Sequence, residues 1–351
     1  MTLSCPLPLA AKDRILLGHG SGGKLSAELL RDVFLPAFRS PVLNRLDDQA
    51  VVEAGGVRLA FTTDSFVVKP LFFRGGDIGS LAVYGTVNDL AMCGAEALYL
   101  SAAFILEEGF AMAALRRIAE SMARAAEAAG VEIVTGDTKV VEKGSGDGVF
   151  INTAGIGLAP VGLSLSAANA RPGDRILLSG TLGDHGIAIL SEREGIAFET
   201  PAESDSAPLN GLVREMLAAT AATAATAGIR AMRDPTRGGL ASTLHEIAAQ
   251  SGVGMALEEE AIPIREEVRG ACELLGLDPL YVANEGKLVA IVAPEAAEAA
   301  LAAMRRHPLG ARASMIGTVT GAHRGMVTLK SVFGTTRLVN MLAGDQLPRI
   351  C

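Results

Sequence analysis

The spacing of apolar and polar positions predicts strands that alternate with long helices. Residues 111–129 form an Ala-rich stretch with helical spacing, and Gly130 is expected to end it. Residues 75–79 are expected to open a second helix that runs to Met92. Strands are predicted at residues 57–63, 98–106, 131–135 and 149–157, of which 98–106 is expected to be buried. This alternation is typical of a mixed α/β layer architecture.

The second half of the chain repeats the alternation after a boundary near residues 163–174. Strands are predicted at residues 175–179 and 288–292, and glycine-containing turns at 183–186 and 233–240 are expected to open helices. Residues 194–210 are predicted to be a polar loop. At 351 residues the chain is too long for one ordinary core. We therefore expect an α+β protein with domains at 1–162 and 163–333, followed by a mobile tail at 334–351.

The chain ends on a cysteine. Pro348 lacks a backbone N–H and favours an extended conformation at Leu347, so Cys351 is expected to stand at the end of an extended arm. Such an arm would span on the order of 50–60 Å, enough to cross a domain. Alternatively, the cysteine is incidental, because chain ends are often poorly ordered.

Composition excludes some classes of protein. Apolar residues make up 49% of the chain and charged residues 20%, which is typical of a packed globular protein. The net charge of −8 argues against nucleic acid as a partner. No signal peptide or membrane span is predicted. The four cysteines lie far apart and suggest neither a disulfide framework nor a zinc site, so a cytoplasmic location is the simplest expectation.

A glycine-rich loop occupies residues 18–24 and precedes a helical pattern. It matches GxxxxGK, but Leu25 stands where a P-loop has the Ser or Thr that binds magnesium. We therefore expect a lid that closes over phosphates with Lys24, and not a P-loop. The alternative is an ordinary loop before a helix.

Aspartates recur just after predicted strands and at turns. They are Asp48, Asp64, Asp89, Asp137 and Asp234. Magnesium is typically held by one or two carboxylates together with substrate phosphates, and clustered carboxylates without a cation raise one another's pKa. Each aspartate alone is better explained as a helix cap or turn residue. Together with the glycine-rich turns they favour a nucleotide–magnesium site.

A series of short motifs carries a family resemblance. In chain order the motifs are His19-Gly-Ser-Gly-Gly-Lys24, Asp47-Asp48, Thr62-Thr-Asp-Ser65, Gly76-Asp-Ile-Gly79, Asn88-Asp-Leu-Ala91, Gly136-Asp-Thr-Lys139, Asp234-Pro-Thr-Arg-Gly-Gly239, Asn284-Glu-Gly286 and Pro348-Arg-Ile-Cys351. The series resembles HypE, the carbamoyl dehydratase family that matures nickel–iron hydrogenases. The internal motifs are shared with the aminoimidazole ribonucleotide synthetase and selenophosphate synthetase superfamily, whereas the terminal motif is the discriminating one.

The resemblance implies a set of site residues and a dimer. It implies a homodimer that forms through the N-terminal sheets, with ATP sites near that interface. Magnesium would be held by Asp48, Asp89 and Asp234. Nucleotide contacts would come from Lys24, Asp64, Asp89, Gly136, Asp137 and Thr138, and catalysis from Cys351, Lys139 and Glu285.

The resemblance also implies a reaction. The carbamoyltransferase HypF would place a carbamoyl group on Cys351, ATP and Mg²⁺ would activate its oxygen, and a base would complete dehydration to a thiocyanate. Glu285 is the candidate base and Lys139 would orient the substrate, although the two roles could be exchanged. The cyanide would then pass to iron on the HypC–HypD complex.

Three alternatives remain at this point. A selenophosphate synthetase is disfavoured, because Ser21 stands where that family has a nucleophilic cysteine or selenocysteine. A small-molecule kinase or synthetase of the superfamily would have no use for a cysteine arm. A non-catalytic carrier that displays Cys351 would leave the acidic motifs without a purpose.

Overall fold

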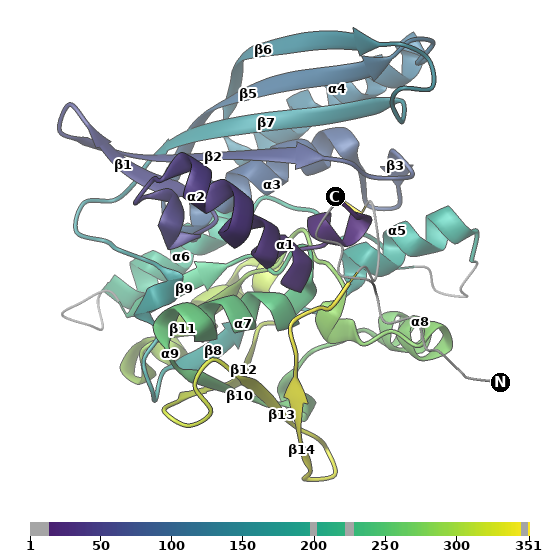
Figure 1. Cartoon of the computed structure of the whole chain (residues 1–351). Helices are drawn as coiled ribbons and strands as arrows, with labels where there is room; N and C mark the ends of the chain where they lie inside the picture. Colours follow the sequence, from purple (N-terminus) through teal and green to yellow (C-terminus); the bar gives the residue numbers. More distant parts are fainter. Residues whose placement is uncertain (1–13, 197–201, 222–227, 345–349) are drawn as a thin grey trace.

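The N-terminal part of the chain builds a five-stranded sheet (Figure 1). The computed structural model describes residues 14–196, 202–221, 228–344 and 350–351. The strand order is β1-β2-β7-β5-β6, and only the β5–β6 pair is parallel. The strands are β1 (Ala50–Ala54), β2 (Val57–Phe66), β5 (Glu96–Glu107), β6 (Glu132–Val141) and β7 (Val149–Leu158).

Two long helices cover one face of this sheet. Helix α3 (Ile78–Met92) packs on β2 and β7, and helix α4 (Met112–Ala129) packs on α3. The carboxylate of Asp77 starts α3 by accepting hydrogen bonds from the backbone of Gly79 and Ser80. Gly130 ends α4 with a φ of 71°, a conformation that glycine adopts without steric cost.

The opposite face of the sheet is open in the single chain. Nearly every residue of β6 is exposed. Large apolar side chains are exposed along the strands at Phe61, Tyr99, Ile105, Ile133, Val134, Val140 and Leu158. An apolar sheet face beside an unpaired edge strand is unusual for a monomer in water.

Short elements precede and flank this domain. Helix α1 (Lys24–Leu29) continues through a π-helical turn (Leu30–Phe34) into α2 (Leu35–Phe38). A small hairpin joins β3 (Phe72–Phe73) to β4 (Gly76–Asp77).

The C-terminal part builds a seven-stranded sheet with helices around it. The strand order is β14-β13-β10-β12-β8-β11-β9. The strands are β8 (Arg175–Leu178), β9 (Ile229–Arg233), β10 (Gly254–Glu258), β11 (Val289–Val292), β12 (Ser314–Thr320), β13 (Val327–Lys330) and β14 (Thr336–Val339). The helices are α5 (Asp184–Glu194), α6 (Asn210–Ala221), α7 (Gly239–Ser251), α8 (Glu266–Leu275) and α9 (Pro294–Arg306). Every residue of β11 is buried, as expected for a central strand with both faces covered.

The two domains are joined by a buried polar contact as well as by apolar packing. Asn88, on α3, is 1% exposed and donates hydrogen bonds to the carbonyls of Ala207 and Glu285. Its own side-chain oxygen accepts from the backbone N–H of Leu209. The N-terminal helix thereby fixes the backbone of the Asn284-Glu-Gly286 motif.

Most predicted elements are confirmed, and the mixed layers and two-domain α+β class agree with the structure. The strand predicted to end at residue 135 is longer than expected, because the Gly136-Asp-Thr-Lys139 motif lies within β6. The strand expected to be buried at residues 98–106 is half-exposed along β5, since one face of its sheet is open. In the segment expected as a tail, β14 pairs with β13, and residues 345–349, including Pro348, lie outside the described residues. In the described ranges, no helix combines the length and apolar character that a bilayer crossing requires.

Candidate active site

Four of the predicted aspartates are brought together where the domains meet. Burial, and then the neighbouring carboxylates of Asp234, Asp64 and Asp48, raise the pKa of Asp89 well above its usual range. The pKa of Asp234 is raised in the same way by burial and by Asp48. Elements far apart in sequence therefore supply one acidic cluster: the loop before β1, strand β2, helix α3 and the turn after β9.

Asp48 has a buried carboxylate oxygen that no group of the described residues hydrogen-bonds. Burial raises the pKa of Asp48 to about 6, although the nearby Arg233 opposes the shift. Its Oδ1 lies 3.2 Å from Nε of Arg233, whereas its Oδ2 is buried without a hydrogen-bond partner. The hydroxyl of Thr62 lies 2.8 Å from Oδ2 of Asp89, so Asp89 is oriented from β2.

A polar pocket opens beside the cluster. Its lining includes Asp48, Asp234, Arg237 and Gly22 of the glycine-rich loop. Gly22 has a φ of 71°, and a Cβ there would lie 2.4 Å from the carbonyl oxygen of Arg237, so only glycine allows this approach. The predicted glycine-rich loop therefore lies over the site.

The glycine-rich loop also hydrogen-bonds to the segment predicted as the tail. The hydroxyl of Ser21 donates to the carbonyl of Gly344 at 2.8 Å, and the backbone N–H of Lys24 donates to the carbonyl of Leu342. The Lys24 side chain is 69% exposed and lies 4.0 Å from Glu28. Lys24 is thus at the mouth of the site, with its ammonium in solvent.

The end of the chain lies inside the site. The backbone N–H of Val67 donates to the carbonyl oxygen of Cys351 at 2.8 Å, and Ile350 forms an antiparallel bridge with Val68. Ile350 is 5% exposed and packs in the core of the N-terminal domain, while Cys351 is half-buried. Burial raises the pKa of the Cys351 thiol far above its ordinary value, and Arg237 partly offsets this effect.

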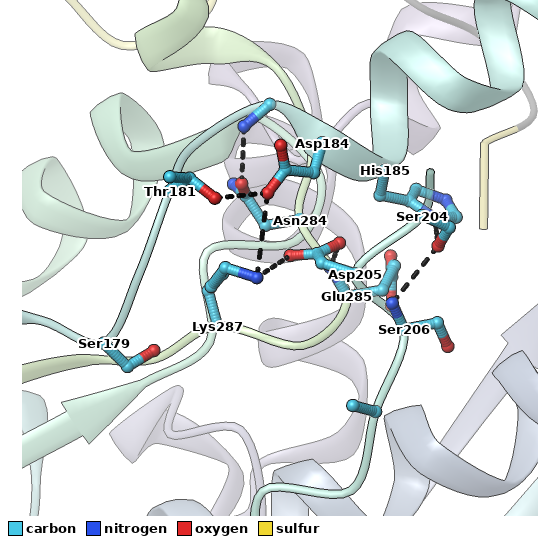
Figure 2. A network of polar contacts seen from close by, with 12 residues as sticks. Ser179, Thr181, Asp184, His185, Ser204, Asp205, Ser206, Asn284, Glu285 and Lys287 are labelled. Atoms are coloured by element: carbon cyan, nitrogen blue, oxygen red, sulfur yellow. Dashed lines mark hydrogen bonds and ion pairs between the residues drawn. The ribbon is translucent and has the colours of Figure 1, made fainter. Parts of the chain in front are cut away.

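Glu285 faces the same region. It is 3% exposed, its Oε1 is buried without a hydrogen-bond partner, and burial followed by the charges of Asp234 and Asp205 raises its pKa well above its usual range. The backbone N–H of Glu285 donates to Oδ1 of Asp205 at 3.1 Å (Figure 2). The charge of Glu285 adds to the effect of burial on the pKa of the Cys351 thiol, so the predicted base lies near the predicted thiol.

The Gly136-Asp-Thr-Lys139 motif does not join this site in the single chain. Figure 1 shows β6 at the outer edge of the N-terminal sheet, away from the C-terminus. Nζ of Lys139 pairs with Asp137 at 2.7 Å, with side chains 70% and 62% exposed. Lys139 is therefore not assembled with Glu285 and Cys351 by one copy of the chain.

Three residues of the site were not singled out from the sequence. The charge of Cys351 is the largest cause of the raised pKa of Arg237, and Nη1 of Arg237 donates to the carbonyl of Gly20. His185 and Asp205 contact Ile350 and Glu285, respectively. Arg237 stands within the recognised Asp234–Gly239 motif, so the signal for it was present. His185 and Asp205 carry no spacing signal.

Comparisons with known proteins place this geometry in a family. Family models described as "AIR synthase related protein, N-terminal domain" and "C-terminal domain" match residues 46–159 and 171–330. The carbamoyl dehydratase HypE of Cupriavidus necator is 58% identical over 346 residues, which cover 98% of this chain and 97% of that relative. The chain belongs to the HypE family of carbamoyl dehydratases.

Solved structures of the same family have the same fold. The chain matches a HypE in a HypE–HypF complex with a TM-score of 0.84 and 50% identity, over 90% of this chain and 99% of that one. It matches a HypE in complex with ATP with a TM-score of 0.80 and 51% identity, over 96% of this chain and all of that one.

Proposed function

We propose that this chain uses ATP to dehydrate a carbamoyl group on the sulfur of its own Cys351, yielding a thiocyanate for the iron of nickel–iron hydrogenase. The observation that carries the proposal is the position of Ile350 and Cys351, which lie in the acidic site beside Glu285 and Arg237. Membership in a family of carbamoyl dehydratases and the ATP complex of a relative support it.

The reaction balances with the groups at hand. The carbamoyl oxygen attacks the γ-phosphorus of ATP, and ADP leaves. One nitrogen proton goes to Glu285 and the other to the departing phosphate; loss of the oxygen as phosphate then leaves a carbon–nitrogen triple bond on Sγ of Cys351. Glu285 takes a nitrogen proton in this scheme, because its raised pKa suits a base that must accept and later release it. Arg237 offsets negative charge as phosphate forms.

Magnesium fits the acidic cluster. Within the described part of the chain, no three His, Cys, Asp or Glu side chains are arranged to hold an ion by themselves. The unpartnered Oδ2 of Asp48 and the raised pKa values of Asp89 and Asp234 suit a cation that completes its shell with phosphate oxygens. We assign Asp48, Asp89 and Asp234 as its ligands; the ion would offset charge on the transferred phosphoryl group.

A homodimer would bring the remaining motif into use. The open apolar face of the N-terminal sheet and the exposed edge strand β6 are features of an interface. In the proposed dimer, β6 of one copy presents Gly136, Asp137, Thr138 and Lys139 toward a site of the other. Lys139 would then orient the carbamoyl group, and Asp64, Lys24 and the β6 residues would contact ATP.

The partners follow from the same reaction. A relative is seen in a HypE–HypF complex, and we propose that a HypF carbamoyltransferase loads Cys351 of this chain. The cyano group of this thiocyanate would then pass as cyanide to iron on a HypC–HypD complex in the cytoplasm.

The test is a mass measurement on the full chain. The protein is loaded by its carbamoyltransferase, Mg²⁺ and ATP are added, and intact and C-terminal peptide masses are recorded. Loss of one water from an adduct at Cys351, absent in Cys351→Ala, is the expected result. ATP hydrolysis without any adduct on Cys351 would instead indicate a small-molecule kinase or synthetase, and no ATP hydrolysis would indicate a carrier.

Glu285→Gln separates binding from chemistry in the same assay. We expect this variant to bind ATP with near wild-type affinity while dehydration is lost, because the amide keeps the shape of the side chain but accepts no proton. Normal turnover by Glu285→Gln would remove the base assignment.

A further inference from the structure

The last two residues of the chain are held by more than backbone pairing. Nε2 of His185 lies 2.5 Å from the carbonyl oxygen of Ile350. Nδ1 of the same ring lies 2.8 Å from Oγ of Ser204 (Figure 2). His185 is completely buried at the start of α5, and its ring meets Phe73 edge-to-face at 5.6 Å. His185 therefore links helix α5 of the C-terminal domain to the end of the tail.

The contacts fix the protonation of the ring. A carbonyl oxygen only accepts, so Nε2 of His185 carries the hydrogen that it donates to Ile350. Burial lowers the pKa of His185, which keeps the ring neutral and leaves Nδ1 as an acceptor. The hydroxyl of Ser204 consequently donates to Nδ1, while its oxygen accepts from the backbone N–H of Ser206 at 3.2 Å.

The segment that orients His185 also contacts the proposed base. Asp205, next to Ser204, accepts a hydrogen bond from the backbone N–H of Glu285 and is anchored by Nζ of Lys287 at 3.0 Å. Figure 2 shows these side chains converging from α5, from residues 204–206 and from the Asn284–Lys287 segment. The segment 204–206 therefore orients both the ring of His185, which contacts the tail, and the backbone at Glu285.

We propose that His185, oriented by Ser204, is a positioning residue that docks the Ile350 carbonyl and thereby sets Cys351 in front of Glu285. The inference rests on the proposed function for its catalytic consequence, but the docking itself is measurable without turnover. Val67 and Val68 pair with Cys351 and Ile350 through one hydrogen bond and an isolated antiparallel bridge, and His185 fixes how far Cys351 enters the site.

The experiment measures how fast Cys351 is alkylated, with the modified residue identified by peptide mass. Slow alkylation indicates that the end of the tail is docked in the site. Cys93 and Cys272 give little background, because both are buried and burial raises the pKa of each thiol to about 11. His185→Phe keeps an aromatic ring against Phe73 and removes both hydrogen bonds. We expect it to raise the alkylation rate of Cys351 about 2- to 10-fold, the effect of one lost hydrogen bond, and to lower kcat for dehydration with the KM for ATP unchanged.

Matched variants separate docking from folding. His185→Gln places an amide N–H near Nε2, and we expect it to restore protection and most of the turnover. His245 makes the same kind of contact, from Nε2 to the carbonyl of Val339, so His245→Phe should leave Cys351 alkylation at the wild-type rate. Ser204→Ala is the second route if His185→Phe does not fold, and it should also expose Cys351.

The outcomes distinguish this inference from the proposed function. Wild-type alkylation and turnover in both His185→Phe and Ser204→Ala would overturn the positioning role. A wild-type protein that shows protected Cys351 but never loses water would contradict the proposed function and leave the docking contact supported.

Discussion

Replacing Lys287 by methionine should destabilise the fold strongly. Nζ of Lys287 lies 3.0 Å from Asp205 and 3.9 Å from Asp184, and the three side chains are 10%, 3% and 1% exposed. Removing one partner of a buried pair typically costs about 3–5 kcal/mol, because the remaining charge is left without compensation. Methionine retains most of the packing volume, so the loss of charge dominates. We expect the free energy of unfolding in urea to fall by roughly that amount at pH 7.

The pH dependence is the sharper part of this prediction. Although burial opposes it, the Lys287 ammonium holds the pKa of Asp205 below its ordinary value, so wild-type Asp205 contributes stability above about pH 4 that is lost as pH falls. Without Lys287, burial would raise the pKa of Asp205 and would raise further the pKa of Asp184, which burial already elevates in the wild type. Raised carboxyl pKa values favour the folded state at low pH, so the destabilisation should shrink as pH falls toward about 4.

Two controls make the result interpretable. Lys330 pairs with Glu258 at 3.2 Å with both side chains more than half exposed, and Lys330→Met should cost only about 0.2–1 kcal/mol. The double variant Lys287→Met/Asp205→Asn should recover part of the loss, since it removes a stranded carboxylate. A Lys287→Met cost that equals the Lys330→Met cost, or that is constant from pH 7 to pH 4, would refute the reasoning.

Three further predictions use other parts of the structure. Since Asp48 has a pKa of about 6 and Mg²⁺ requires the carboxylate, the Mg²⁺ concentration for half-maximal turnover should rise up to about tenfold per pH unit below 6; an unchanged value from pH 7 to pH 5 would exclude Asp48 as a ligand. Asn88→Ala leaves two carbonyls and one N–H without partners at the domain contact, so it should lower the free energy of unfolding by at least roughly 1–3 kcal/mol. Asn169 makes one solvent-exposed hydrogen bond, and Asn169→Ala should change the free energy of unfolding by less than about 0.5 kcal/mol in the same titration. Val140→Glu on β6 should yield monomers by light scattering and abolish turnover, and Val332→Glu, on the exposed turn after β13, should not; a dimeric Val140→Glu would contradict the interface.

Local signals accounted for much of the fold. The Asp77 cap and the Gly130 stop marked the ends of α3 and α4, because caps and left-handed glycines act within one turn of the chain. Gly136 caused the strand at residues 131–135 to be predicted too short, since a glycine after a strand usually marks a turn. It is instead required inside β6, where a Cβ would lie 2.1 Å from the carbonyl oxygen of Ala102 on β5. No pattern within one strand shows how closely its neighbour approaches.

The site was predictable to the extent that its residues stand in motifs. Asp48, Asp89, Asp234 and Glu285 do, and the structure gathers them. His185 does not, because its contacts depend on how the loop around Ser204 packs between the domains. In the proposed dimer the position of Lys139 relative to the site would depend on a second copy of the chain, which spacing along one chain does not reveal.

The contact of Val67 with Cys351 has a consequence for turnover. In the proposed reaction the substrate would be covalently part of the enzyme, so the connecting chain would set its effective concentration at the site, and a weak contact would suffice for occupancy. Two hydrogen bonds and the burial of Ile350 together supply about 2.5–6 kcal/mol before the loss of chain entropy. Much tighter binding of Cys351 in the site would keep it from the proteins proposed to load the carbamoyl group and accept the cyanide. The modest size of this contact therefore suits the proposed reaction, in which Cys351 would enter and leave the site once in every cycle.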